Sequence, residues 1–450
     1  MYDVIFIGEK IKSPELKSLC INPDSLLECR GEIGNFQIKY NEKDKIKNEI
    51  GKSIVINLEA ERENPLEKTI TLNNLPDNKE DKEDIIFIQD YEKISPAVIN
   101  RETLNAAIWA KEEFENNEVY FLYRSMRFID DNDNLFDKAR QLGVIFLKYE
   151  MDSIKVDDNE QQVNYKRGDL NLDLTGKIVT APHLKPSQKI KRVARLLNIE
   201  MGDNEYIQSE NIYLQPTLTG KRGVYSLAGA RGPNAYSDLD LEIDFTLNEI
   251  KSNLSGVEPL TEKKREVDEQ KCIMCYTCYR VCPHGAVEKD ENADAMKINE
   301  LACYGCDACL SHCPADAISF VEKEEIKESD LSLKVLMCEN SADTAFKKLD
   351  KEQFQDLDIE KIPCASSIKK DELFSYLRKK DSRLLILGCF EESCKHINGD
   401  GRGERISNEV RNTLEELELG KTRVQFERLS PRMEEDLNDF LLRWKEGDHK

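Results

Sequence analysis

Two copies of one cysteine-rich motif constrain this chain more than any other feature of its sequence. The first copy, residues 272–283, reads Cys-Ile-Met-Cys-Tyr-Thr-Cys-Tyr-Arg-Val-Cys-Pro. The second copy, residues 303–314, reads Cys-Tyr-Gly-Cys-Asp-Ala-Cys-Leu-Ser-His-Cys-Pro. Both follow the spacing C-x2-C-x2-C-x3-C-P, and the residues after each proline also match, which indicates an internal duplication.

This spacing is typical of a segment that binds two [4Fe–4S] clusters. Three closely spaced thiolates ligate one cube, and the fourth, which precedes the proline, reaches the other cube. Pro283 and Pro314 fix φ and turn the chain out of the ligand loop. The predicted ligands are Cys272, Cys275, Cys278 and Cys313 for the first cluster, and Cys303, Cys306, Cys309 and Cys282 for the second. A pair of zinc sites or a disulfide framework is the alternative, although zinc sites usually combine two separated C-x2-C pairs.

Composition limits the class of protein. A length of 450 residues suggests two to four domains. The net charge of −22 argues against a nucleic-acid partner, because phosphates are neutralised by a basic face. No apolar run reaches the roughly 18 residues of a membrane span, and the first residues lack the features of a signal peptide. We therefore expect a cytoplasmic protein with reduced thiols, at most held on a membrane by a partner subunit.

Residues 3–8 form an apolar run that ends in a glycine, like the first half of a dinucleotide-binding unit. A Rossmann turn needs G-x-G-x-x-G, and here only Gly8 is present. Glu9 places like charge near a pyrophosphate, and Pro14 leaves room for only a short helix. Glu28 lies where a ribose-binding acid is found, which is weak evidence in an acidic chain. We therefore favour the loss of a nucleotide site here.

Several segments of residues 1–255 resemble the A-type flavoprotein subunit of heterodisulfide reductase. These segments are residues 31–40, 84–89, 118–124, 139–146 and 223–233. The chain lacks much of that family's ADP-binding unit, and residues 95–100 replace its cysteine-rich stretch. The resemblance implies a degenerate, Rossmann-derived flavoprotein scaffold from which FAD has been lost. If FAD were retained, Gly229 and Gly232 would approach its ring; the alternative is a tight turn before a helix.

Apolar runs and helical periodicity predict a mixed α/β fold in this region. We expect strands buried on both faces at residues 85–88, 119–123, 144–148 and 177–179, and helices at residues 100–114 and 135–141. Residues 248–270 are charged and connect this region to the cysteine-rich segment, and residues 322–329 form a similar charged exit.

The last third of the chain alternates between strand and helix patterns. Strands are expected at residues 333–337, 358–363, 384–388 and 423–428, with helices at residues 342–349, 370–379, 407–417 and 432–445. This order predicts βαβ units and a largely parallel sheet. Ligands in such sheets lie at the carboxyl ends of the strands. Four cysteines fall at three of these ends: Cys338, Cys364, Cys389 and Cys394.

The segments around these cysteines, residues 335–338, 363–364 and 385–394, resemble the delta subunit of methyl-viologen-reducing hydrogenase. The resemblance implies a [2Fe–2S] cluster bound by the four thiols. Ser341 stands where that family usually has a further cysteine, but four thiolates suffice. The alternatives are free buried cysteines, a zinc site or a Cys389/Cys394 redox pair. His396 is a further candidate ligand, although we expect a surface histidine at this position.

The combination of these parts resembles the B-type subunit of the quinone-interacting membrane-bound oxidoreductase complex. It implies an α/β multidomain protein with a flavoprotein-derived region at residues 1–255, an α+β double-cluster ferredoxin domain at 265–322 and a hydrogenase-delta-like domain at 331–450. The expected function is an electron-transfer subunit without catalytic residues, which relays electrons between hydrogenase-, dehydrogenase- or heterodisulfide-reductase-like partners. The alternatives are an FAD-dependent oxidoreductase and a non-conducting redox-sensing or scaffold protein.

Overall fold

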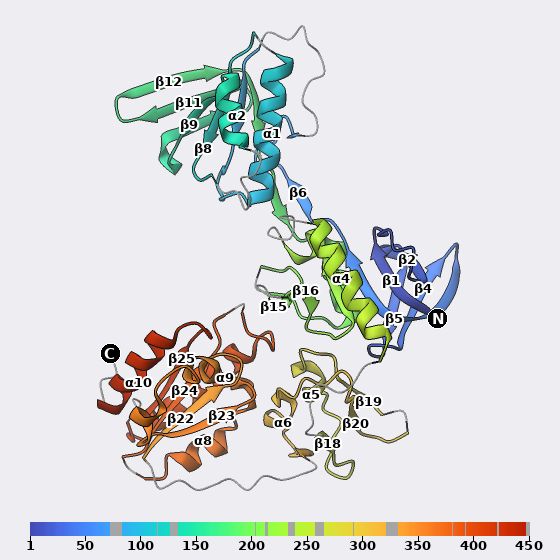
Figure 1. The fold of residues 1–450 in the computed structure, drawn as a ribbon, viewed down its shortest axis with the longest axis vertical. Coiled ribbons are helices and arrows are strands. Elements are labelled where there is room, and N and C mark those ends of the chain that lie inside the picture. Colours follow the sequence, from blue (N-terminus) through green and yellow to red (C-terminus); the bar gives the residue numbers. More distant parts are fainter. Residues whose placement is uncertain are drawn as a thin grey trace. The chain divides into compact units, whose positions relative to one another are not determined.

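The computed structural model describes all residues except 73–82, 115, 127–133, 203, 212–214, 233–238, 257–264, 291, 321–331, 380, 392, 421–422 and 447–450. The chain divides into two compact units. The first unit comprises residues 1–56, 192–226 and 244–450, and the second comprises residues 57–191 and 227–243. The fold is α/β with several separate sheets, as the sequence predicts (Figure 1). The predicted charged exit at residues 322–329 lies outside the described residues.

The first unit begins with an eight-stranded mixed sheet. Its strands are β1 (Tyr2–Gly8), β2 (Ser18–Ile21), β3 (Leu26–Arg30), β4 (Phe36–Glu42), β5 (Lys45–Asn57), β15 (Ser209–Asn211), β16 (Gln215–Thr219) and β17 (Val224–Leu227). β1 and β2 are parallel neighbours, and the loop 9–17 between them contains no helix. The short helix for which the sequence left room is therefore absent. Without its N-terminus, a pyrophosphate loses its usual main-chain donors at this strand end.

The second unit contains a parallel sheet in the order β13-β7-β8-β9. Its strands are β7 (Ile85–Ile88), β8 (Val119–Tyr123), β9 (Ile145–Lys148) and β13 (Lys177–Thr180), and its helices include α1 (Ala97–Glu113) and α2 (Leu135–Leu142). Side chains alternate across the sheet: Phe87 and Phe121 pack with the helices, whereas Ile86 and Leu122 face the other side. A three-stranded meander covers that side, formed by β10 (Ile154–Asp157), β11 (Gln162–Arg167) and β12 (Leu170–Thr175).

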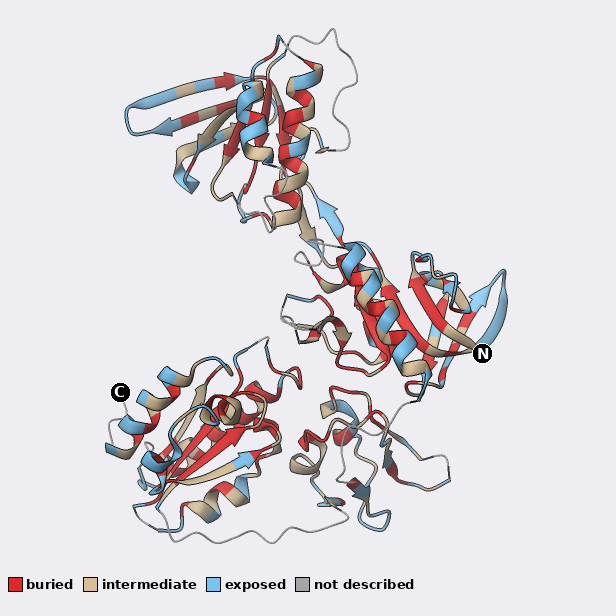
Figure 2. Ribbon diagram, viewed as in Figure 1, coloured by how far each residue is buried: buried red, intermediate tan, exposed pale blue. Residues whose placement is uncertain are grey.

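Burial in this sheet differs from the sequence expectation at one strand. β7 is buried at every residue, as predicted, but no residue of β9 is buried (Figure 2). β9 is the edge strand of the sheet, so it has a neighbour on one side alone. Further strands and helices described in the first 255 residues include β6 (Glu61–Glu63), β14 (His183–Lys185), α3 (Gln188–Leu197) and α4 (Leu239–Leu254).

The cysteine-rich segment folds as two short antiparallel pairs and two short helices. The elements are β18 (Arg265–Val267), α5 (Thr277–Val281), β19 (Val287–Lys289), β20 (Met296–Ile298), α6 (Ala308–Ser311) and β21 (Ile318–Phe320). β18 pairs with β21, and β19 pairs with β20. The duplication extends to the backbone: matched positions of the two halves have positive φ, at Tyr276 (58°) and Asp307 (57°) and at Gly285 (62°) and Asp316 (46°).

The C-terminal part of the first unit is a parallel sheet in the order β23-β22-β24-β25, which confirms the predicted topology. Its strands are β22 (Leu333–Cys338), β23 (Asp358–Ile362), β24 (Arg383–Gly388) and β25 (Val424–Arg428). Helices α7 (Ala342–Phe346) and α10 (Glu434–Glu446) pack on one face, and α8 (Lys370–Tyr376) and α9 (Gly399–Glu416) pack on the other. α9 begins at Gly399 rather than at the predicted Ser407. Within the described residues, none of the helices has the length and apolar character needed to cross a bilayer.

Candidate iron–sulfur centres

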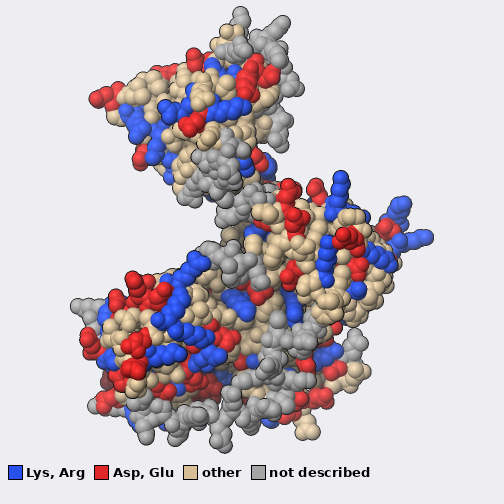
Figure 3. Space-filling model, in the orientation of Figure 1, with Lys and Arg blue, Asp and Glu red and all other residues tan. Residues whose placement is uncertain are grey.

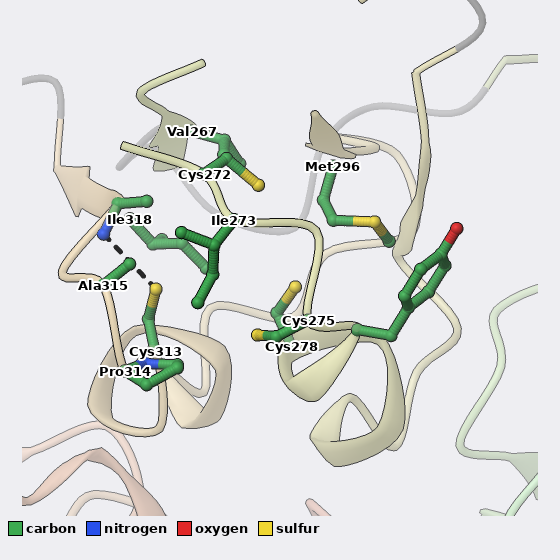
Figure 4. A pocket seen from close by; sticks show the side chains of 12 residues that line it. Val267, Cys272, Ile273, Cys275, Cys278, Met296, Cys313, Pro314, Ala315 and Ile318 are labelled. Carbon is green, nitrogen blue, oxygen red and sulfur yellow. Dashed lines mark hydrogen bonds between the residues drawn. The ribbon is translucent and has the colours of Figure 1, made fainter. Parts of the chain in front are cut away.

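The four cysteines predicted to hold the first cluster line one pocket. Cys272 and Cys275 lie on the loop before α5, Cys278 lies within α5, and Cys313 follows α6. Figure 4 shows these four side chains around the pocket that they line. Val267, Met296 and Ile318 supply apolar walls to the pocket. The donor set and the enclosure fit a [4Fe–4S] cluster.

The four cysteines predicted to hold the second cluster line another pocket. Cys303, Cys306 and Cys309 come from the second copy of the motif, and Cys282 comes from the first copy. The structure thus brings together each predicted quartet, with the fourth cysteine crossing between the two halves. This crossing is the arrangement that the doubled motif predicts.

A main-chain donor supports the fourth thiol of each quartet. The Ala286 N–H donates to Cys282 Sγ at 3.4 Å, and the Ala317 N–H donates to Cys313 Sγ at 3.3 Å, the latter drawn in Figure 4. Hydrogen bonds to the ligating sulfurs are among the factors that set the potential of an iron–sulfur cluster. The two halves therefore share this contact as well as their spacing.

The electrostatic surroundings of the two quartets differ. In the first, Cys275 Sγ lies 3.3 Å from the Thr277 hydroxyl, which lowers the pKa of this thiol, whereas burial raises the pKa of Cys278 to about 11. In the second, burial raises the pKa of every thiol; for Cys306 it reaches about 12. Thiolates are the form that binds iron, so the second quartet depends more on the positive charge of the metal to lose its protons.

Buried polar contacts surround the second quartet. Arg265 Nε donates to Asp307 Oδ1 at 2.6 Å, and both side chains are more than nine-tenths buried. The Tyr304 hydroxyl donates to Glu210 at 3.2 Å, and burial raises the pKa of Glu210. The second quartet is therefore enclosed by side chains from its own segment and from the N-terminal sheet.

The four C-terminal cysteines converge at the carboxyl ends of β22, β23 and β24, where the sequence predicted them. All four are buried, and Cys338 Sγ lies 3.8 Å from Cys389 Sγ. Cys364 and Cys394 interact directly, which raises the pKa of Cys364 and lowers that of Cys394. At Gly399 an added Cβ would lie 2.3 Å from Cys364 Sγ, so glycine is required for the approach of α9. This compact group of thiols fits a metal cluster.

Ser341, the departure from the hydrogenase-delta pattern, lies beside this group. Its side chain is 1% exposed, and its Oγ has no hydrogen bond of ordinary geometry within the described chain. The hydroxyl nevertheless contributes to a lowered pKa of Cys338, for which the contact with Cys389 is the main cause. Ser366 Oγ, in turn, donates to Cys364 Sγ at 3.2 Å.

The second quartet and the C-terminal thiols are neighbours in the first unit. Cys306 and Ala308 pack in one buried cluster with Cys338, Cys364, Cys389 and Cys394. Two hydrogen bonds to main-chain oxygens join the same segments: Ser311 Oγ donates to Ser366 at 2.6 Å, and Arg402 donates to Val281 at 2.6 Å. The first quartet contributes none of its thiols to this buried cluster.

Two histidines lie where the second quartet meets the C-terminal thiols, and the sequence analysis did not place them there. His396 is 3% exposed, so the expectation of a surface histidine is wrong. His396 Nδ1 lies 3.0 Å from His284 Nε2, and His284 Nδ1 lies 2.7 Å from the Gly220 oxygen. Because a carbonyl can only accept, His284 Nδ1 carries the proton and its Nε2 accepts from His396. The available clue was position, since His284 and His396 follow Cys282 and Cys394 by two residues.

The glycines considered for a flavin lie in the second unit. Gly229 is buried within a 3-10 turn at Ala228–Arg231, and Gly232 follows it with φ of 108°. Arg231 forms an ion pair with Glu242 on α4. This geometry is that of a tight turn before a helix, and residues 233–238 between the turn and α4 lie outside the described residues. A role of Gly229 and Gly232 in flavin binding stays a prediction.

Comparison with protein families bears on two parts of the chain. Residues 261–330 match the 4Fe-4S dicluster domain. Residues 334–446 match the methyl-viologen-reducing hydrogenase, delta subunit. The two matches confirm the resemblances predicted for the cysteine-rich segment and for the C-terminal part, and they support an iron–sulfur electron-transfer role.

Two curated proteins share further similarity with the chain. A protein of Archaeoglobus profundus that is named for its likeness to the A-type subunit of heterodisulfide reductase is 26% identical over 203 residues, which cover 43% of this chain and 28% of that protein. A polyferredoxin-like protein of Methanocaldococcus jannaschii is 35% identical over 69 residues, covering 13% of this chain and 28% of that protein. The first match confirms the predicted resemblance to the heterodisulfide reductase flavoprotein. The chain spans little more than a quarter of the length of either relative.

Solved structures share only distant similarity with the chain. Bacillithiol disulfide reductase of Staphylococcus aureus is 12% identical, covering 54% of this chain and 72% of its own, with a TM-score of 0.35. A thioredoxin reductase of Gloeobacter violaceus is 10% identical, covering 57% of this chain and 96% of its own, with a TM-score of 0.22.

Proposed function

We propose that this chain is an electron-transfer iron–sulfur subunit of a larger oxidoreductase complex. Electrons pass between partner subunits through two [4Fe–4S] clusters and one [2Fe–2S] cluster. The proposed ligands are the twelve cysteines of the three groups described above. The protein's part in this chemistry is to hold the clusters close together and to set their potentials through burial, charge and hydrogen bonds.

One observation carries this proposal: Cys306 of the second quartet packs in the same buried cluster as the C-terminal thiols. A series of centres conducts when neighbouring centres are close, and this contact joins the second quartet to the C-terminal group. The duplicated fold joins the first quartet to the second, because Cys282 and Cys313 cross between the halves. The order of the relay is therefore first cubane, second cubane, C-terminal cluster, in either direction of flow.

The C-terminal geometry favours a metal cluster over unrelated buried thiols. Two thiolates bound to one tetrahedral metal at about 2.3 Å are separated by about 3.8 Å, the separation between Cys338 and Cys389. Cys394 interacts with both Cys364 and Cys389, so the four thiols form one contiguous group that suits a two-iron cluster. Ser341 then lies beside a ligand without being one.

The partners are proposed from the same matches. One relative is named for its likeness to a heterodisulfide reductase subunit, and the C-terminal family is named for a hydrogenase subunit, which supports other oxidoreductase subunits as donors and acceptors. The net charge of −22, with both signs of charge mixed on the face in Figure 3, gives no support to a nucleic-acid partner. We propose a cytoplasmic location, with any membrane attachment provided by a partner.

Anaerobic quantification of iron, sulfide and flavin in the purified full-length chain tests the proposal. We expect about ten irons per chain, from two cubanes and one [2Fe–2S] cluster, with each cluster reversibly reducible in an EPR redox titration. About eight irons would remove the C-terminal cluster from the relay. Stoichiometric FAD would favour the flavoenzyme alternative, and clusters without a reversible one-electron couple would favour a sensor or scaffold.

A further inference from the structure

A buried lysine that follows a strand of the N-terminal sheet lies against Gly285, three residues after Cys282 of the second quartet. Lys221 follows β16 and is only 5% exposed. Its Nζ donates to the Leu197 main-chain oxygen at 3.1 Å and lies 5.7 Å from the centre of the Phe36 ring. Burying an ammonium group is costly unless a negative charge compensates it. The position of Lys221 therefore requires a source of negative charge.

No carboxylate among the described residues forms an ion pair with Lys221. Glu32 and Glu288 act on Lys221 only from beyond ion-pair distance, and Glu288 is paired with Lys297 at 3.2 Å. Cys29 is also near, but burial raises the pKa of this thiol to about 11, so it stays neutral at ordinary pH. The protein side chains around Lys221 thus leave its charge largely uncompensated.

The main chain holds Lys221 against the first copy of the cysteine motif. The preceding residue, Gly220, accepts a hydrogen bond from His284, and a Cβ on Gly220 would lie 3.0 Å from the Pro283 oxygen. At Gly285, the Cβ position lies 3.4 Å from Lys221 Cδ and 3.6 Å from its Nζ. Burial lowers the pKa of Lys221, and the neighbouring Cys29 and Cys282 act in the opposite direction, which favours the charged form. The Lys221 side chain therefore lies beside Gly285, three residues after Cys282, which is a proposed ligand of the second cluster.

The matched position in the second copy of the motif differs from Gly285 in its charge. Asp316 occupies the position that matches Gly285 and has the same left-handed backbone. Asp316 pairs with Lys369 at 3.3 Å, so the lysine near that half has a carboxylate partner. A glycine at 285 leaves room for Lys221 and provides no counter-charge. The lysine at one half is neutralised by a side chain, whereas the lysine at the other half is not.

We propose that Lys221 is the counter-ion of the second [4Fe–4S] cluster and raises its reduction potential. This inference rests on the proposed function, because it needs a cluster on Cys282, Cys303, Cys306 and Cys309. A cubane with four thiolates carries net negative charge, and its reduction adds one more. A buried cation beside it stabilises the reduced state more than the oxidised state, since Coulomb interactions are strong where water is excluded.

An EPR-monitored redox titration of the full-length holo protein tests this role. Lys221→Met keeps the apolar stem and removes the charge. We expect the one-electron reduction equilibrium of one cubane to weaken at least about ten-fold, equivalent to a fall of about 59 mV in midpoint potential. The affected cubane is the one whose spectrum disappears in Cys306→Ala. Lys369→Met, which removes a paired lysine near the matched half, should change neither equilibrium by more than about two-fold.

Gly285→Asp is the reciprocal variant, because it gives Lys221 the carboxylate that Lys369 already has. It should lower the potential of the same cubane in the same direction as Lys221→Met. Unchanged potentials in both variants, or an equal shift in Lys369→Met, would overturn the role of Lys221. A wild-type chain that holds fewer than two cubanes would overturn the proposed function itself.

If Lys221→Met does not bind the second cubane, the unfolding temperature of the apoprotein distinguishes a counter-ion role of Lys221 from a packing role. Without the cluster, the charge of Lys221 is uncompensated, so the variant apoprotein should unfold at the same temperature as wild-type apoprotein or at a higher one. A lower unfolding temperature would show that Lys221 is needed for packing alone and would contradict its role as a counter-ion.

Discussion

The two halves of the duplicated segment share one motif and one backbone path but differ in their surroundings. In the first half, Ile273 and Tyr276 are 63% and 42% exposed beside the cysteine ligands. Asp307, which matches Tyr276 in the second half, is 6% exposed and paired with Arg265. Ligand spacing therefore determines which thiols share a pocket, and the neighbouring segments determine the burial and charge around each quartet.

This difference accounts for the roles proposed for the two cubanes. Exposed apolar and aromatic side chains beside the first quartet, among them Ile273, Tyr276 and Tyr279, suit exchange of electrons with a partner subunit. The second quartet is enclosed by Glu210 and Tyr304 on one side and by the C-terminal thiols on another. It suits transfer within the chain, where water and foreign oxidants are excluded.

The largest difference between the two halves is expected when one cysteine ligand is removed from each quartet. Cys306→Ala should remove about four irons and also weaken iron binding at the C-terminal site, because Cys306 packs against its thiols. Cys275→Ala should remove about four irons and leave the C-terminal cluster intact. Iron analysis with EPR of each cluster provides the measurement. Equal effects of the two variants on the C-terminal cluster would contradict the assigned order.

The buried ion pair of the second half gives the next largest effect. Asp307→Ala leaves Arg265 buried without its main partner, which should cost about 3–5 kcal/mol of unfolding free energy. Tyr276→Ala, at the matched exposed position, should cost only about 0.5 kcal/mol. Urea unfolding followed by loss of cluster absorbance measures both. Similar costs at the two positions would show that burial does not distinguish the halves.

A substitution in α9 separates the C-terminal site from the cubanes. Gly399→Ala drives a Cβ into Cys364 Sγ and should remove about two irons while the cubane spectra persist. Gly401→Ala is the matched control, because its Cβ would meet only the movable Asn398 side chain. Retention of the [2Fe–2S] signal in Gly399→Ala would refute the assignment of Cys364 as a ligand.

The smallest effect is expected at Ser341. Ser341→Cys restores the thiol that the hydrogenase-delta family usually carries, beside a group that already has four thiols. The iron content should stay at about ten per chain, and the [2Fe–2S] spectrum should change little. A gain of about two irons over wild type would show that the natural chain lacks the C-terminal cluster.

Much of this arrangement follows from the sequence because its determinants are local. The cysteine spacing predicted which thiols share a pocket, although they lie on different halves. Apolar runs predicted β7 and β8 with their observed bounds, and the βαβ order predicted the parallel C-terminal sheet. The domain bounds and the metal ligation itself stay predictions.

The features that escaped the sequence depend on contacts between distant segments. The sequence predicted a helix from Ser407, whereas α9 begins at Gly399, and Gly399 and Gly403 allow it to pack closely on Cys364 and Ala365. His396 pairs with His284, and Lys221 reaches Gly285, across separations that no local pattern records.

EPR of the fully reduced holo protein tests the central claim, that the second cubane joins the first to the C-terminal cluster. We predict that the [2Fe–2S] signal shows fast relaxation and broadening from a neighbouring paramagnet. This effect should persist in Cys275→Ala and disappear in Cys306→Ala. A [2Fe–2S] signal that is unbroadened in wild type, or that loses its broadening only in Cys275→Ala, would contradict the account.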